Sequence, residues 1–172
     1  MGSPYPAPRV VIAFNNEEGK SVYARDDQVP MISPFGPNGS QMATFYSTNT
    51  VPASNVAPLP PLATTSLPRP GPKGTVFCTS DIPPGTETPF HRTSSVDYAI
   101  VLKGEIVCRL NHGVEKTIKE GEMFVQCGTI HAWENRSDQW CRLLAVMIAA
   151  EPVVLKDGTV LEEVSIPPKP KQ

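Results

Sequence analysis

Short runs of alternating apolar and polar residues recur along the chain, and no stretch carries the 3.6-residue apolar period of a long amphipathic helix. Gly, Asn, Asp and Pro residues separate these runs, as is typical of an all-β sandwich or barrel. The clearest predicted strands are 75–82, 88–94, 96–104, 105–110, 114–120, 121–126, 130–137 and 140–150. Weaker candidates are 9–14, 21–25 and 41–48. The pattern therefore predicts an all-β fold, an antiparallel double-sheet barrel over residues 74–150.

The flanks of this barrel have a different composition. Prolines number 20 in 172 residues, more than twice the background of about 5%. They cluster in 55–74 and at the C-terminus, which favours extended connectors over helices. We expect residues 1–73 to form an N-terminal arm with added strands and a proline-rich connector, and 151–172 to form a C-terminal strand and proline-rich tail. An arm beside open sheet edges predicts a homodimer.

Charge and cysteine usage narrow the class of protein. Fifteen Lys and Arg residues are interspersed with 17 Asp and Glu residues, giving a formal charge of −2. No basic stripe or patch indicates a nucleic acid or membrane partner, and no apolar run approaches the roughly 20 residues that span a bilayer. The four cysteines form no CxxC pair, so we interpret them as reduced, structural thiols of a cytoplasmic protein.

Candidate chemistry follows from the alternation of side chains along a strand. His91 and Thr93 share one face of their run, and His131 and Trp133 share one face of theirs. Asp97 shares a face with the apolar residues two and four positions later. Two histidines forty residues apart could therefore meet inside a small barrel, with Asp97 near them and Trp133 as a wall.

The spacing of these residues resembles the two motifs of the cupin family. The first family motif reads Gly, five residues, His-x-His, three or four residues, Glu, six residues, Gly. The corresponding residues of this chain are Gly85, His91, Thr93, Asp97 and Gly104. The second motif ends in Gly, two residues, His, three residues, Asn, and its counterparts are Gly121, Gln126 at the usual proline position, Gly128, His131 and Asn135. The resemblance implies a single cupin barrel of the small, single-domain type.

The resemblance also implies a place for a metal. His91, Asp97 and His131 occupy ligand positions of the family, and Thr93 occupies the fourth. A threonine hydroxyl is a poorer ligand than imidazole for a borderline divalent ion, and Asp is one methylene shorter than the family's Glu. Two histidines and one carboxylate remain, which is the composition of a non-haem iron triad. The expected cofactor is thus either none or one divalent metal, Fe or Zn.

The alternative is acid–base chemistry without a metal, as in the cupin-like sugar epimerases. In that case His91 would be the base, oriented by Asp97, and His131 the proton donor or an oxyanion-binding group. Thr93, Trp133, Gln126 and Phe124 would contact the substrate.

Three functions remain open on this basis. The first is a lyase or isomerase that dehydrates, decarboxylates or tautomerises an oxygenated substrate by His-mediated proton transfer. Because similar small fungal cupins accompany secondary metabolism, the resemblance implies a polyketide-derived substrate. The second is an iron-dependent dioxygenase, and the third is a non-catalytic module that binds a small ligand.

Overall fold

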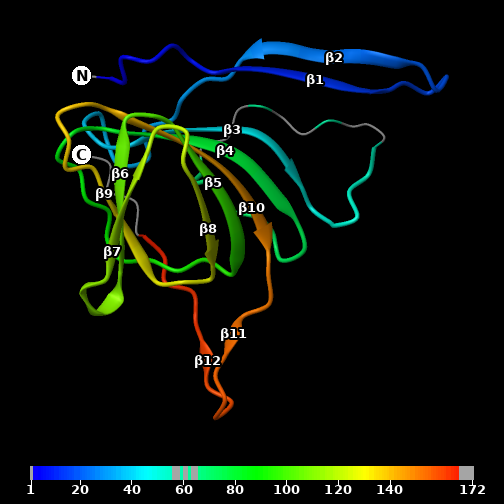
Figure 1. Cartoon of the computed structure of the whole chain (residues 1–172). Helices are drawn as coiled ribbons and strands as arrows, with labels where there is room; N and C mark the ends of the chain where they lie inside the picture. The colour runs from blue at the N-terminus through cyan, green and yellow to red at the C-terminus, as the bar shows by residue number, and fades with distance from the viewer. Residues whose placement is uncertain (1, 56–58, 60–61, 63–65, 167–172) are drawn as a thin grey trace.

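The computed structural model describes residues 2–55, 59, 62 and 66–166, which form an all-β structure (Figure 1). The strands are β1 (Arg9–Asn15), β2 (Ser21–Gln28), β3 (Gln41–Thr48), β4 (Thr75–Ile82), β5 (Ser95–Lys103), β6 (Glu105–Leu110), β7 (Glu115–Lys119), β8 (Met123–Cys127), β9 (His131–Glu134), β10 (Cys141–Ala149), β11 (Val153–Val154) and β12 (Val160–Leu161). Within the described ranges, no helix has the length and apolar character needed to cross a membrane. Much of the predicted proline-rich connector, and the tail beyond Ile166, lie outside the described residues.

Two antiparallel sheets face each other and enclose the barrel interior (Figure 1). One sheet has the strand order β3-β4-β10-β5-β8, and the other has the order β7-β6-β9. Two further hairpins, β1-β2 and β11-β12, project from opposite ends of the barrel in this view. The expected all-β barrel is therefore confirmed, and β3 from the predicted arm is one of its edge strands.

The period-two alternation of the sequence produces the core between the two sheets. On β5, Ala99 and Val101 point inward and are buried, whereas Tyr98, the residue before Ala99, is half exposed. The register places Ala99 opposite Ala145 of β10, so small inward residues meet across the strand pair. A one-residue slip would turn each of these side chains to the other face, so burial fixes the register. The main core cluster consists of Ile82, Ala99, Val101, Ile106, Cys108, Ile118, Cys141 and Leu143.

Gly104 makes the tight link between the two sheets possible. It connects β5 to β6 with a φ of 75°, a left-handed conformation that disfavours residues with a Cβ. A Cβ at this position would also lie 2.6 Å from the carbonyl oxygen of Trp140. Both constraints require glycine at the end of the first motif.

The segment before β1 is attached to the barrel through a buried ion pair. Arg142 donates two hydrogen bonds to Asp81, at 2.6 and 2.7 Å, and the Asp81 side chain is fully buried. Ser3 donates a third hydrogen bond to the same carboxylate, and the Arg142 guanidinium lies 5.1 Å from the centre of the Tyr5 ring. Asp81 therefore holds both a barrel strand and the N-terminal segment.

One predicted strand, 88–94, is wrong as a continuous strand. The segment forms only isolated bridges, with His91 pairing to His131 and Arg92 pairing to Val164. Pro89 has no amide hydrogen to donate to a ladder, which is one reason for the interruption. Because consecutive residues bridge to different partners, the segment brings the C-terminal region, up to Ile166, beside the barrel opening.

Candidate active site

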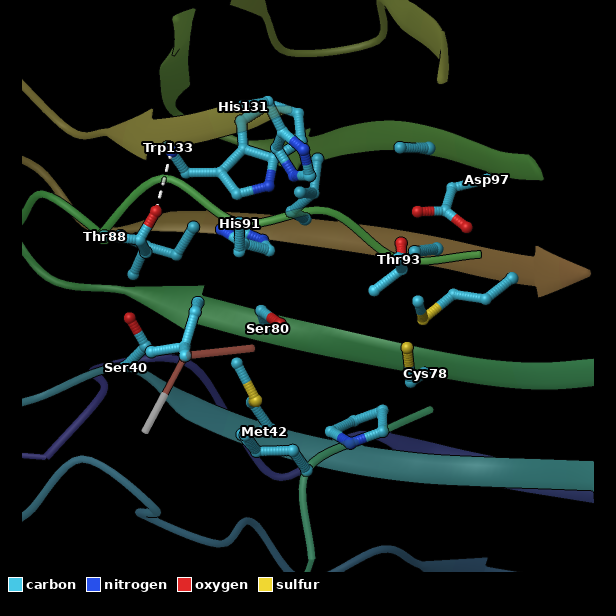
Figure 2. A pocket seen from close by; sticks show the side chains of 18 of the residues that line it. Ser40, Met42, Cys78, Ser80, Thr88, His91, Thr93, Asp97, His131 and Trp133 are labelled. Carbon is cyan, nitrogen blue, oxygen red and sulfur yellow. Dashed lines mark hydrogen bonds between the residues drawn. The ribbon is translucent and has the colours of Figure 1, made fainter. Parts of the chain in front are cut away.

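Two histidines lie side by side in the interior of the barrel. The backbones of His91 and His131 exchange two hydrogen bonds, at 2.8 and 2.9 Å. The bridge places the two imidazoles on the same face, with ring centres 4.1 Å apart and planes inclined by 52°. Figure 2 shows the two rings close together beside Trp133. The two histidines therefore meet inside the barrel, as the alternation of side chains along the strands predicts.

Backbone carbonyl groups fix the tautomer of both rings. Nδ1 of His91 lies 2.9 Å from the carbonyl oxygen of Pro89, and Nδ1 of His131 lies 3.1 Å from that of Thr129. A carbonyl oxygen can only accept, so each Nδ1 must carry the hydrogen. Each Nε2 is then unprotonated in the neutral ring, with a lone pair that can take a proton or bind a ligand.

Burial keeps both rings neutral. Burial lowers the pKa of His131 to about 4, and the neighbouring His91 acts in the same direction. Burial also lowers the pKa of His91, where the hydrogen bond to Pro89 opposes the shift and the charge of Arg69 adds to it. A buried imidazole loses the hydration that stabilises its charged form. Both residues therefore present neutral imidazoles at neutral pH.

The histidines line a largely apolar cavity of about 130 Å³, roughly ten times the space that one water molecule needs. Trp133 packs edge-on against His131, with ring centres 5.5 Å apart, and against Phe124, at 5.6 Å. Met147 and Leu143 contribute further apolar surface. The predicted substrate contacts Phe124, Thr93, Gln126 and Trp133 all line this cavity.

Asp97 lies in the same cavity but apart from the histidine pair. In Figure 2, its carboxylate lies beyond Thr93, on the side away from the two imidazoles. The Pro89 carbonyl group, rather than Asp97, accepts the Nδ1 hydrogen of His91. One carboxylate oxygen of Asp97 is buried without a hydrogen-bond partner among the described residues. Burial raises the pKa of this carboxyl group.

The family resemblance implies a metal ion, which needs a sufficient set of donor atoms close together. Structural and catalytic metal sites in proteins usually use three or four His, Cys, Asp or Glu ligands. The described part of the chain contains no group of three such residues that could hold a metal ion. His91 and His131 supply two adjacent nitrogens, but among the described residues no third His, Cys, Asp or Glu side chain, Asp97 included, completes a metal site with them. The residues present do not fit the expected triad.

Segments from outside the two motifs complete the cavity. Sequence reasoning missed them because they come from the N-terminal third, the connector and the C-terminal region, where no motif marks them. They are Phe35, Ser40, Met42, Leu67, Pro68, Arg69 and Ile166. Arg92 binds the carbonyl oxygens of Gly128 and Glu162 and so positions the C-terminal segment. The arm and the C-terminal segment therefore both form walls of the cavity.

The fold and the cavity define a small β-barrel protein with a histidine pair in its interior. Residues 78–147 match the Cupin_2 family, described as "Cupin domain". Over 82% of this chain and 87% of the other, the structure is similar to the cupin domain of Cnp3 from Schizosaccharomyces pombe, with a TM-score of 0.52 and 11% identity. Residues 78–147 form a cupin domain, as the two motifs indicated.

Curated relatives come from fungi. "Phomopsin biosynthesis cluster protein C'" of Diaporthe leptostromiformis is 43% identical over 91 residues, which are 52% of this chain and 48% of that protein. "Cupin-domain-containing oxidoreductase virC" of Hypocrea virens is 28% identical over 93% of this chain and 88% of that protein. The chain thus spans about half the length of relatives such as the phomopsin cluster protein.

Proposed function

We propose that the chain is a small-molecule enzyme, a lyase or isomerase, in which His91 removes a proton from an oxygenated substrate and returns it elsewhere. The observation that carries the proposal is a pair of adjacent, neutral imidazoles that line an apolar cavity. Each has a fixed tautomer with an unprotonated Nε2. A neutral imidazole whose tautomer is already set is prepared to act as a general base.

The two histidines differ in burial, and this difference assigns their roles. Burial and the neighbouring His91 lower the pKa of His131 to about 4, whereas His91 is only partly buried, so a proton is less costly on His91. A proton on His91 also disfavours a second charge on His131. We therefore assign proton abstraction to His91, while His131 stays neutral and accepts a hydrogen bond from a substrate hydroxyl group.

Thr93 supplies the third element of the reaction. The Ser95 hydroxyl group donates to the Thr93 hydroxyl oxygen at 2.8 Å, so the Thr93 hydrogen can be donated to a developing enolate oxygen. In a dehydration, His91 takes the hydrogen next to the substrate carbonyl and Thr93 stabilises the enolate. The His91 proton then passes to the β-hydroxyl group, which leaves as water as the C=C bond forms. In an isomerisation, the same proton returns to another carbon.

The comparisons support an enzyme of fungal secondary metabolism. Relatives are named for biosynthesis clusters of phomopsins and oryzines. On this basis the substrate would be a secondary metabolite or its precursor. The resemblance to small fungal cupins implies that it is derived from a polyketide. The apolar lining of the cavity suits such a molecule.

The test uses a simple β-hydroxy ketone, the aldol adduct of acetone and benzaldehyde, in deuterated water. We expect the wild-type protein to exchange the hydrogen next to the carbonyl group and to release the conjugated enone. His91→Gln should reduce both rates by about 100-fold or more. His112→Gln, at an exposed turn position, is the matched control and should keep the wild-type rates. Equal rates in all three proteins would refute the assignment, and binding without exchange would favour the non-catalytic alternative.

Redox chemistry is the second candidate, because the relative from Hypocrea virens is named an oxidoreductase. Elemental analysis of the tag-free protein and of His91→Ala separates the two candidates. About one equivalent of iron that disappears in the variant, together with oxygen consumption, would favour the redox reaction over metal-free proton transfer.

A further inference from the structure

Gln126, near the end of β8, is a buried polar side chain with no hydrogen-bond partner among the described residues. It is only 2% exposed and lines the cavity. Neither its amide nitrogen nor its amide oxygen has a hydrogen-bond partner among the described residues. Nearly all buried polar groups in folded proteins are paired, so an amide with both heteroatoms unpaired requires an explanation.

The groups beside Gln126 are also available to a ligand. The register of β5 and β8 places Gln126 directly opposite Asp97, and side chains of such a pair lie close together on one face. Asp97 has an unpaired, buried carboxylate oxygen. Figure 2 shows Thr93 and Asp97 together, with the histidine pair at the other side of the cavity.

Stability alone does not account for this arrangement. An unpaired buried amide destabilises the folded protein, whereas an apolar side chain of similar shape at the same place can be neutral or stabilising. Such costs are typical of sites whose partner is a ligand. The cavity therefore has a reactive end, at the histidines, and a recognition end, at Gln126.

Charge limits the ligand that this end can take. Among the described lining residues, Arg69 is the one permanently charged cation, and it is paired with Glu163 at 3.5 Å. An anion beside the Asp97 carboxyl group would have no compensating cation. The complementary group is therefore neutral, with a donor and an acceptor side by side in one plane to match the amide of Gln126.

We propose that Gln126, with Asp97, forms a recognition subsite for a neutral planar donor–acceptor group of the substrate, such as a carboxamide or an enolised β-dicarbonyl. This assignment rests on the proposed function in that it describes the part of the substrate that does not react at His91. It makes Gln126 a specificity-determining residue rather than a catalytic one.

Binding of benzamide, followed by NMR titration, tests the subsite without any turnover. Gln126→Leu should weaken benzamide binding by about tenfold or more, while ethylbenzene, which lacks the polar group, should bind equally well or better. Gln28→Leu, at an exposed position, is the matched control and should bind both probes as the wild type does. Unchanged benzamide affinity in Gln126→Leu, or no benzamide binding to the wild type, would overturn the proposal.

Thermal unfolding gives a second, independent outcome. If the amide group of Gln126 serves to bind a ligand, Gln126→Leu should melt at the same temperature as the wild type or at a higher one. A clear fall would mean that ordered water or protein groups satisfy Gln126, and that its role is structural.

His91→Gln distinguishes failure of the subsite from failure of the proposed function. If binding depends on Gln126 but His91→Gln turns over the β-hydroxy ketone at the wild-type rate, the subsite stands and the assignment of His91 fails. If turnover depends on His91 but Gln126→Leu binds benzamide as tightly as the wild type does, the subsite fails and the proposed function stands.

Discussion

Lowering the pH from 7 to 5 should destabilise the protein through His131. The imidazole is 3% exposed, and its pKa falls from 6.5 to about 4 on folding, chiefly through burial and also through His91. The unfolded chain therefore takes up a proton first as the pH falls. Stability from the neutral ring is present above about pH 6.5 and is lost progressively towards pH 4.

The size of the effect follows from the two pKa values. Integrating the proton uptake of this one group between pH 7 and pH 5 gives a loss of about 2 kcal/mol in the free energy of unfolding. For a chain of this length the loss corresponds to a fall of about 4–8 °C in melting temperature. Urea unfolding at both pH values, for the wild type and for His131→Gln, measures it. All other titrating groups are present in both proteins. The contribution of His131 is therefore the pH-dependent change in unfolding free energy of the wild type minus that of His131→Gln.

A parallel loss of stability in the two proteins would refute the reasoning. It would mean that His131 is charged in the folded protein, or is hydrated at both pH values. Burial would then not be what keeps the His131 imidazole neutral.

Three other predictions concern stability, metal uptake and assembly. Asp81→Ala should destabilise the protein by about 3 kcal/mol or more in urea unfolding, because Arg142, whose side chain is 11% exposed, loses its partner. Asp26→Ala, which removes a solvent-exposed ion pair, should change stability little, and equal effects of the two variants would contradict the role of burial. Thr93→His should raise the metal content measured by elemental analysis, because it places an imidazole where the family has its second histidine ligand. An unchanged metal content would mean that the side chains at this position and its neighbours are not arranged to bind a metal. We propose that the chain forms a homodimer through its N-terminal arm or the open edges of its sheets. Light scattering should give twice the mass of one chain, and the mass of a single chain would exclude the dimer.

Local patterns in the sequence were sufficient to predict the strands and the family. The alternation around Ala99 and Val101 predicted a half-buried strand, because side chains on a strand alternate between faces whatever the rest of the fold does. Motif spacing predicted that His91 and His131 would share the interior, and they do. The interruption of 88–94 was not predictable from periodicity, because its bridging partners lie far along the chain.

The chemistry of the site depended on contacts that no local pattern records. Asp97 was expected to orient His91, but the carbonyl group of Pro89 does so, because a short non-strand segment brings that oxygen within reach of Nδ1. The unpaired amide of Gln126 is visible only once its surroundings are known.

The sequence by itself determined an antiparallel barrel and the two histidines, since both follow from strand periodicity and from the spacing of residues along neighbouring strands. The tertiary structure alone decided which nitrogen of each imidazole is free, how far Asp97 lies from the pair, and which distant segments close the cavity. Hydrogen bonds and burial depend on groups brought together across the fold, and their identity is not encoded in the period of any one strand.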